Sequence, residues 1–246
     1  MLVAPDGATI AYRRIPGKGP GVMFLTGFRS DMQGGKALAV EALCRAQRRA
    51  FVRFDYTGHG LSSGAFADGT IGRWTEDALS VLDRATDGPQ VLVGSSMGGW
   101  IALLLARARP ERIAGLVGIA AAPDFTEDLV RDVLDDTARA RLARDGQIVM
   151  PSAYDPEPCV ITRRLIDEGR NHLILRGPIP IGAPVRLIHG MEDHDVPWQT
   201  ALKIAERLAT ADVEVTLVKG GRHRLSEPAD LARLTAIVES LLGHVG

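Results

Sequence analysis

The sequence predicts an α/β fold with a mostly parallel sheet and helices on both faces. Short apolar runs alternate with longer segments of helical periodicity along most of the 246 residues, and this alternation is typical of parallel strands joined by crossover helices. The alternation stops near residue 123 and resumes near residue 183. A separate segment therefore interrupts an otherwise regular sheet.

The predicted strands are short runs of apolar or alternating residues bounded by turn residues. The run at 9–15 alternates, which indicates a half-buried strand, whereas the run at 22–26 is largely apolar, which indicates a buried one. We expect strands at residues 9–15, 22–26, 50–54, 90–93, 116–120, 185–188 and 213–218.

The predicted helices carry apolar residues three or four positions apart. A final helix is expected to begin after Ser226, a candidate N-cap that is followed by Glu227 and Pro228. The other helices are expected at residues 36–49, 71–85, 97–109, 126–144, 160–169 and 198–208.

The interruption defines the expected domain organisation. We interpret residues 1–246 as one domain whose core consists of residues 1–122 and 183–246. Open α/β sheets bind ligands beyond the carboxyl ends of their strands. We therefore expect residues 123–182 to form a small helical cap over that edge.

Composition argues against several classes of partner. The chain has 29 Lys+Arg and 30 Asp+Glu, a net charge of −1, without a block of like charge, so general attraction to nucleic acid or to anionic membranes is not expected. No apolar run approaches the roughly 20 residues that span a bilayer, and the N-terminus does not resemble a signal peptide. Cys44 and Cys159 lack CxxC spacing and are expected to be free thiols. We expect a cytoplasmic protein without a transmembrane segment and leave its oligomeric state open.

The strongest chemical signal is the segment Gly94-Ser95-Ser96-Met97-Gly98-Gly99, which lies between a predicted strand and a predicted helix. It satisfies the pattern Gly-x-Ser-x-Gly with Ser96 as the serine, and a sharp strand-to-helix turn needs the glycines because bulkier neighbours would clash. Ser95 is one position too early in the pattern. Ser96 is therefore the predicted nucleophile.

A serine nucleophile needs a general base that is held by a third group. His223 lies in a glycine-containing loop after the predicted strand at 213–218, at the sheet edge where Ser96 is expected. The loop after the strand at 185–188 offers three acids, namely Glu192, Asp193 and Asp195. The same loop contains His189 and His194, but without helical H-x-x-x-H spacing we prefer loop hydrogen bonding to a metal site.

Four segments of the chain resemble the α/β-hydrolases, in the order of that family. Residues 55–62 resemble its Asp-x-x-Gly-x-Gly-x-Ser loop, residues 94–99 its nucleophile elbow, residues 189–197 its acid loop and residues 220–223 its histidine loop. The resemblance implies an α/β-hydrolase fold and places the family's acid on Asp193.

A narrower resemblance lies in residues 24–37. Most α/β-hydrolases carry His-Gly in this segment, whereas this chain has Thr26-Gly27. The segment is similar to that of the mitochondrial palmitoyl-protein thioesterase and acyl-glucuronide esterase type and its bacterial relatives. By position, this resemblance implies an oxyanion hole formed by the backbone N–H groups of Phe28 and Met97.

We therefore expect a serine hydrolase that cleaves acyl esters or thioesters through an acyl-enzyme on Ser96, with His223 as general base and Asp193 as its orienting acid. A palmitoyl-thioesterase-like or carboxylesterase activity fits best, and the substrate is a small acyl compound or an acylated protein. No cofactor and no metal are expected. The alternatives are a C–C bond hydrolase, a perhydrolase or a peptidase on the same fold, or a non-catalytic binding protein.

The expected cap carries an apolar stripe that includes Leu129 and Val133. Such a stripe either packs the cap onto the core or forms a wall of an acyl pocket, and packing is the better interpretation for most of its residues. Phe125, Leu129 and Val133 are the candidate substrate contacts.

Overall fold

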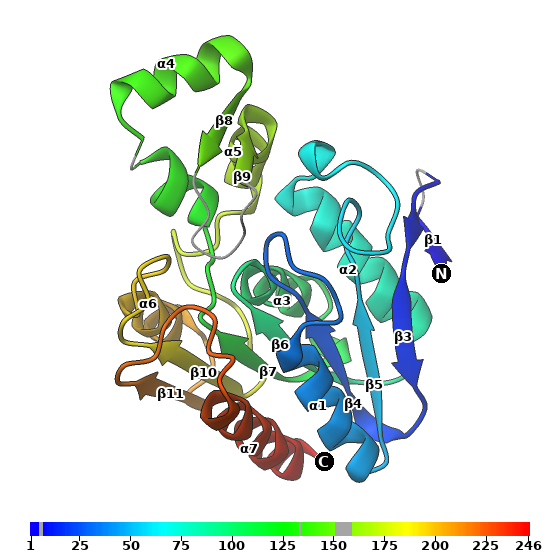
Figure 1. Cartoon of the computed structure of the whole chain (residues 1–246). Coiled ribbons are helices and arrows are strands. Elements are labelled where there is room, and N and C mark those ends of the chain that lie inside the picture. Colours follow the sequence, from blue (N-terminus) through cyan, green and yellow to red (C-terminus); the bar gives the residue numbers. More distant parts are fainter. Residues whose placement is uncertain (5–6, 133, 151–158) are drawn as a thin grey trace.

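The computed structural model describes residues 1–4, 7–132, 134–150 and 159–246. A seven-stranded sheet forms its centre, in which every neighbouring pair is parallel except the pair at one edge (Figure 1). The strands follow in the order β11 (Val213–Val218), β10 (Val185–Gly190), β7 (Ile113–Ile119), β6 (Gln90–Ser95), β4 (Lys18–Leu25), β5 (Arg49–Phe54) and the antiparallel β3 (Tyr12–Ile15). The predicted mostly parallel sheet is confirmed.

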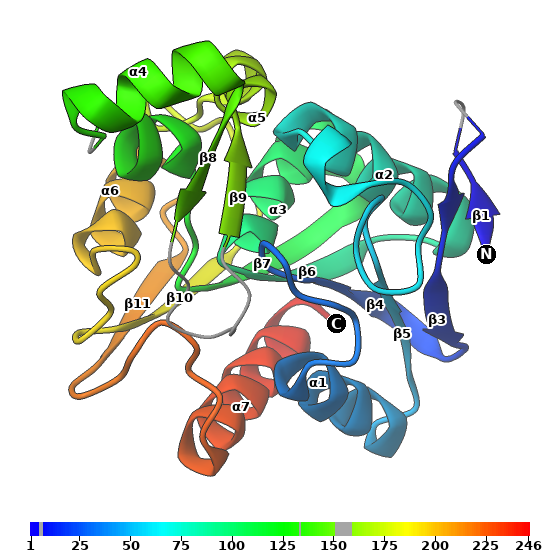
Figure 2. The same ribbon diagram turned by 45° about the horizontal axis from the view of Figure 1, so that its top comes forward.

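Helices cover both faces of the sheet (Figures 1 and 2). One face packs against α1 (Gly35–Ala46) and α7 (Pro228–Val245), and the other against α2 (Ile71–Ala85), α3 (Met97–Ala108) and α6 (Gln199–Arg207). Helix α3 is buried from Met97 to Ala106, which explains why its sequence is apolar on all sides. Two short helical turns, η1 (Phe66–Asp68) and η2 (Pro110–Arg112), complete the core.

The segment between β7 and β10 lies above the carboxyl ends of the central strands (Figure 1). We propose that it is the cap. Its elements are the π-helical segment η3 (Thr126–Arg131), α4 (Asp136–Asp145), the antiparallel pair β8 (Gln147–Met150) and β9 (Cys159–Thr162), α5 (Arg163–Gly169) and η4 (Arg170–His172).

The cap differs from the sequence prediction in two elements. The helix expected over 126–144 is divided, because the Asp135 side chain accepts a hydrogen bond from the Ala138 backbone N–H and starts a new helix there. The helix expected over 160–169 begins as strand β9, which pairs with β8. Thr162 then caps α5 by accepting a hydrogen bond from the Leu165 N–H.

Smaller differences occur in the core. The strand expected over 9–15 is split, since β2 (Thr9–Ile10) pairs with β1 (Leu2–Val3) while β3 pairs with β5. Helix α1 ends at Ala46, and Arg48 has a positive φ of 55° before β5 begins. The N-cap of α7 is Glu227 rather than Ser226, because Glu227 and Asp230 form a capping box.

Asp124 ties the two ends of the cap segment together. Its side chain is fully buried and accepts hydrogen bonds from the backbone N–H groups of Ile174 (2.8 Å) and Leu175 (2.9 Å). The Arg176 guanidinium lies 3.7 Å from the same carboxylate. These contacts join the chain entering the cap to the chain leaving it.

Within the described ranges, no helix has both the length and the apolar character needed to cross a membrane.

Candidate active site

Ser96 lies between β6 and α3 with φ 53° and ψ −118°. A positive φ is strained for a side chain other than glycine, and here it results from the abrupt change from strand to helix. A Cβ atom on Gly98 would collide with the backbone of Leu25, so the turn requires glycine there. Ser95 remains part of β6 and is buried, whereas Ser96 is partly accessible.

The structure brings Ser96, His223 and Asp193 together, although they come from three different loops. The His223 Nε2 atom lies 3.1 Å from the Ser96 Oγ, and its Nδ1 atom lies 2.8 Å from the Asp193 Oδ2. The three side chains therefore form a continuous chain of hydrogen bonds from a carboxylate to a serine hydroxyl.

The acid loop and the histidine loop approach each other through their backbones. The Met191 N–H donates to the Val218 carbonyl at 2.9 Å, and the Glu192 N–H donates to the Gly221 carbonyl at 2.8 Å. A Cβ atom on Gly190 would collide with the Gly221 backbone, so this close approach requires glycine. It places the loop of His223 directly against the loop of Asp193.

The Asp193 carboxylate is buried and accepts hydrogen bonds on both oxygens. The backbone N–H groups of Asp195 and Val196 donate to Oδ1, each at 2.9 Å. His189 and His223 approach Oδ2 at 3.1 and 2.8 Å. Burial by itself would raise the pKa of Asp193, but the hydrogen bonds from His189 and His223 outweigh burial and hold the pKa well below its usual range. Asp193 is therefore ionised.

The proposed oxyanion hole would use two backbone N–H groups near Ser96. Met97 is the first residue of α3, so its N–H has no acceptor within the helix. Gly27 packs against the Ser96 side chain, as a Cβ atom built on it would lie 3.5 Å from the Ser96 Cβ, and this contact places the following residue, Phe28, near the serine. Among the described residues, neither N–H donates to a protein acceptor. The positive end of the α3 dipole also favours negative charge here.

The loop after β4 is held in place by the segment at 55–62. Asp55 accepts hydrogen bonds from the Met32 N–H (2.6 Å) and the Leu61 N–H (2.8 Å). The Arg29 N–H donates to the His59 Nε2 at 3.3 Å, and Arg29 has a positive φ of 57°. His59 thus supports the turn next to Phe28.

His59 is neutral in this environment. Burial lowers its pKa from 6.5 to about 4. Since its Nε2 atom accepts a hydrogen bond, the ring proton is on Nδ1, which lies 3.3 Å from the Thr57 carbonyl oxygen. A neutral ring is required, because a protonated Nε2 could not accept the Arg29 N–H.

Of the candidate substrate contacts, Phe125 lies beside the site. Its ring is 5.7 Å from that of Phe28 and 5.7 Å from that of Trp100, both edge-on. Leu129 is half-buried against the core, and Val133 lies outside the described residues. Phe28 follows Gly27, which packs against Ser96, so this group of three aromatic rings begins close to the serine, while Trp100 is fully buried behind Phe125.

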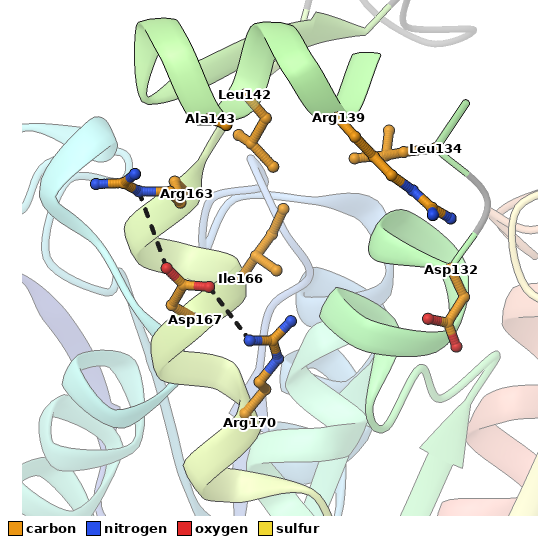
Figure 3. A pocket seen from close by; sticks show the side chains of 9 residues that line it. All are labelled: Asp132, Leu134, Arg139, Leu142, Ala143, Arg163, Ile166, Asp167 and Arg170. Atoms are coloured by element: carbon orange, nitrogen blue, oxygen red, sulfur yellow. Dashed lines mark hydrogen bonds and ion pairs between the residues drawn. The ribbon is translucent and has the colours of Figure 1, made fainter. Parts of the chain in front are cut away.

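A separate pocket of about 290 Å³ lies within the cap (Figure 3). Its apolar residues include Leu142 and Ile166, and Asp167 forms ion pairs with Arg163 and Arg170 on either side. It is lined by none of the candidate catalytic or substrate-binding residues.

The structure also reveals two contacts that sequence reasoning missed. His189, expected only to form loop hydrogen bonds, is buried and bonds directly to Asp193. The Lys36 ammonium group donates to the Arg224 carbonyl oxygen, next to His223. The position of His189 in the acid loop was a signal for the first contact, whereas no pattern in the sequence connects residues 36 and 224.

The acid loop, which was considered as a metal site, does not bring its histidines and acids together around one point. Glu192 and His194 are exposed, while His189 faces Asp193. Asp193, Asp195 and His223 do place ligand-type atoms within 4.8 Å of one another. However, the described hydrogen bonds already use both Asp193 oxygens, and a cation would have to displace them.

The family described as "Serine aminopeptidase, S33" matches residues 22–159. Together with the fold and the elbow, this match shows that the chain belongs to the α/β-hydrolases of that family. The predicted fold class is confirmed, and the chain is a hydrolase rather than a non-catalytic binding protein.

Several named proteins of the superfamily are similar to this chain over nearly its whole length. The chain is 44% identical to "Palmitoyl-protein thioesterase ABHD10, mitochondrial" of Mus musculus, over 95% of this chain and 78% of that protein. The mouse structure of alpha/beta hydrolase domain-containing protein 10 superposes with a TM-score of 0.93 at 42% identity, covering 100% of this chain and 98% of that one. A putative hydrolase from Agrobacterium vitis S4 gives a TM-score of 0.94 at 44% identity, covering 97% and 95%. The narrower resemblance is confirmed.

These relatives contradict the expected cytoplasmic location. The curated proteins of mouse, cattle and rat at 41–44% identity are named as mitochondrial. The physical reason is that receptors read cellular location from address signals. The expectation depended on the lack of a signal-peptide pattern and of a long apolar run, and other address signals need neither feature.

Proposed function

We propose that this chain hydrolyses acyl esters and thioesters through a covalent acyl-enzyme on Ser96. The observation that carries the proposal is the continuous hydrogen-bond chain from Asp193 through His223 to the Ser96 hydroxyl, with distances of 2.8 and 3.1 Å. A serine, a base and an orienting acid in this geometry are the parts that activate a weak nucleophile.

In the first half of the reaction, His223 Nε2 takes the Ser96 proton while Oγ attacks the acyl carbonyl carbon. Asp193 keeps the Nδ1–H tautomer and stabilises the imidazolium that forms. The developing oxyanion accepts hydrogen bonds from the Phe28 and Met97 N–H groups, and each such donor is worth about 2.7–4 kcal/mol in known cases. The carbon–sulfur or carbon–oxygen bond then breaks, and the thiol or alcohol leaves with the proton from His223.

In the second half, His223 removes a proton from water, and the resulting hydroxide attacks the Ser96 ester. The tetrahedral intermediate collapses to release the carboxylic acid, and Ser96 recovers its proton from His223. The net reaction consumes one water and requires no cofactor.

The acyl group is proposed to lie on the aromatic surface of Phe28 and Phe125, with Leu129 beyond them on the cap. The two rings are in edge-on contact, and Phe28 follows Gly27, which packs against Ser96, so they offer the apolar contact that an acyl chain requires. The mouse relative is named a palmitoyl-protein thioesterase, which supports a long-chain acyl thioester, including one carried by a protein, as the preferred substrate.

The test is hydrolysis of matched acyl thioesters and acyl esters of graded chain length by the wild-type protein and by Ser96→Ala. We expect turnover to rise with chain length and to fall by at least about 10³-fold in Ser96→Ala. A fluorophosphonate probe should label the wild type and fail to label this variant. Ser95→Ala is the matched control and should still be labelled.

Two outcomes would overturn the proposal. Wild-type turnover and labelling in Ser96→Ala would exclude Ser96 as the nucleophile. Cleavage of aminoacyl p-nitroanilides in preference to all acyl esters and thioesters would instead favour a peptidase.

A further inference from the structure

His189 occupies an unusual position for a histidine outside the proposed triad. It lies near the end of β10 with a relative exposure of 1%. Its Nε2 atom is 3.1 Å from the Asp193 Oδ2 and 3.0 Å from the Val196 carbonyl oxygen. A carbonyl oxygen can only accept a hydrogen bond, so Nε2 must carry the proton and is shared between the two oxygens.

The consequence is that two imidazole rings donate to one carboxylate oxygen. His223 donates to Asp193 Oδ2 from the side of Ser96, and His189 donates to the same oxygen from β10. The backbone N–H groups of Asp195 and Val196 occupy Oδ1. A carboxylate accepts about four hydrogen bonds, so His189 completes its set of donors.

We infer that His189 is a positioning residue for the reaction, which holds the Asp193 carboxylate in the orientation that His223 needs and limits the negative charge available to His223. The inference rests on the proposed function of Ser96, His223 and Asp193. His189 acts on the site through Asp193 and does not contact the substrate.

Two features support this role over simple packing. The Asp193 side chain is completely buried, so without His189 its Oδ2 atom would have only His223 as a donor and no contact with solvent. His189 also contributes to the low pKa of Asp193, where burial acts in the opposite direction. Removing the His189 donor would leave more of the negative charge of the carboxylate to interact with His223, which stabilises the imidazolium more strongly.

Replacing His189 leaves the other charged groups near His223 in place. Asp195 lies on the acid loop within 4.8 Å of the site atoms. Arg222 and Arg224 flank His223 in its own loop, and Lys36 contacts the Arg224 carbonyl from α1. A shift in the pH profile upon replacing His189 would thus report the change at Asp193.

The experiment compares His189→Phe, which removes the donor, with His189→Gln, whose amide N–H can replace it. For His189→Phe we expect kcat to fall by about 10-fold or more with KM nearly unchanged, as for other partners that orient a reacting group. We also expect the acid limb of the kcat/KM profile to move to higher pH. His189→Gln should recover most of kcat and restore the profile. His194→Gln, an exposed histidine in the same loop, is the matched control.

An unshifted pH profile in folded His189→Phe would overturn the inference, as would a loss in folded His189→Gln as large as that in His189→Phe. Circular dichroism and thermal unfolding of each variant show whether it is folded, and His189→Gln keeps the test valid if the Phe variant does not fold. Ser96→Ala separates the two proposals, because full activity in that variant would reject the mechanism itself. If Ser96→Ala loses activity while the His189 variants keep the kcat and pH profile of the wild type, only the role of His189 is rejected.

Discussion

At the scale of single residues, the chemistry depends on side chains held in one protonation state or one strained conformation. Ser96 has a positive φ, and Asp193 is kept ionised by its hydrogen bonds despite burial. His59 is kept neutral by burial, so that it can accept the Arg29 N–H beside Phe28. Each state is maintained by neighbours from other parts of the chain.

The lowered pKa of His59 predicts a loss of stability on acidification. Well above pH 6.5 the ring is neutral in the folded and the unfolded chain. As the pH falls from 6.5 towards 4, the unfolded chain binds a proton that the folded chain does not bind, so the free energy of unfolding decreases, by at most about 3 kcal/mol from this group.

Urea unfolding of wild type and His59→Gln at pH 7.5 and pH 5 measures this effect. Glutamine is neutral at both values, and its amide oxygen can still accept the Arg29 N–H. The wild type should therefore lose more stability between the two pH values than the variant. Equal losses would show that His59 is not a source of the acid sensitivity.

At the scale of elements, the cap segment is tied to the core rather than joined by a free hinge. Asp124 links its two ends. The Glu168 side chain of α5 accepts the Gly72 N–H of α2 at 3.1 Å, and the Trp100 Nε1–H of α3 donates to the His172 carbonyl at 3.1 Å. These contacts fix the cap segment against α2 and α3.

Asp124→Ala is expected to destabilise the protein by about 2–4 kcal/mol, because it leaves two buried N–H groups without an acceptor. Asp124→Asn is the matched control. It keeps one acceptor and tolerates the positive φ of 60° at this position, so its cost should be smaller. Urea unfolding gives both values. Equal stability of Asp124→Ala and wild type would show that Asp124 does not hold the two ends of the cap segment together.

At the scale of the whole molecule, the parallel sheet brings the site together. Loops after β4, β6, β10 and β11 supply Phe28, Ser96, Asp193 and His223, and parallel strands end at one edge. The net charge of the chain is −1, so no long-range field is expected to steer an uncharged acyl substrate.

We therefore expect kcat/KM for an uncharged ester to change by less than about two-fold between low and high salt. Steady-state rates at 20 mM and 500 mM sodium chloride test this expectation, with an acyl thioester that carries phosphate groups as the comparison. A change of ten-fold or more for the uncharged ester would contradict it.

Sequence reasoning was most accurate where local patterns are strong. Helix α2 has the expected bounds, 71–85, because its amphipathic period is regular, and β11 matches its expected bounds of 213–218. It was least accurate in the cap, where the strand pairing of β8 with β9 depends on a partner rather than on local periodicity. At the site, the glycine pattern and the order of the loops indicated Ser96, His223 and the acid loop, but not the role of His189.

Local sequence was enough to establish the alternation of strands and helices, the sharp turn at Ser96 and the loops that reach the carboxyl edge, because these depend on neighbours in the chain and on where glycine is required. The folded arrangement was needed to show that Phe125 faces Phe28, that His59 accepts the Arg29 N–H and that His189 and His223 share one oxygen of Asp193. Most of these contacts join residues far apart in the chain. All of them depend on packing and side-chain direction, which periodicity and spacing do not specify.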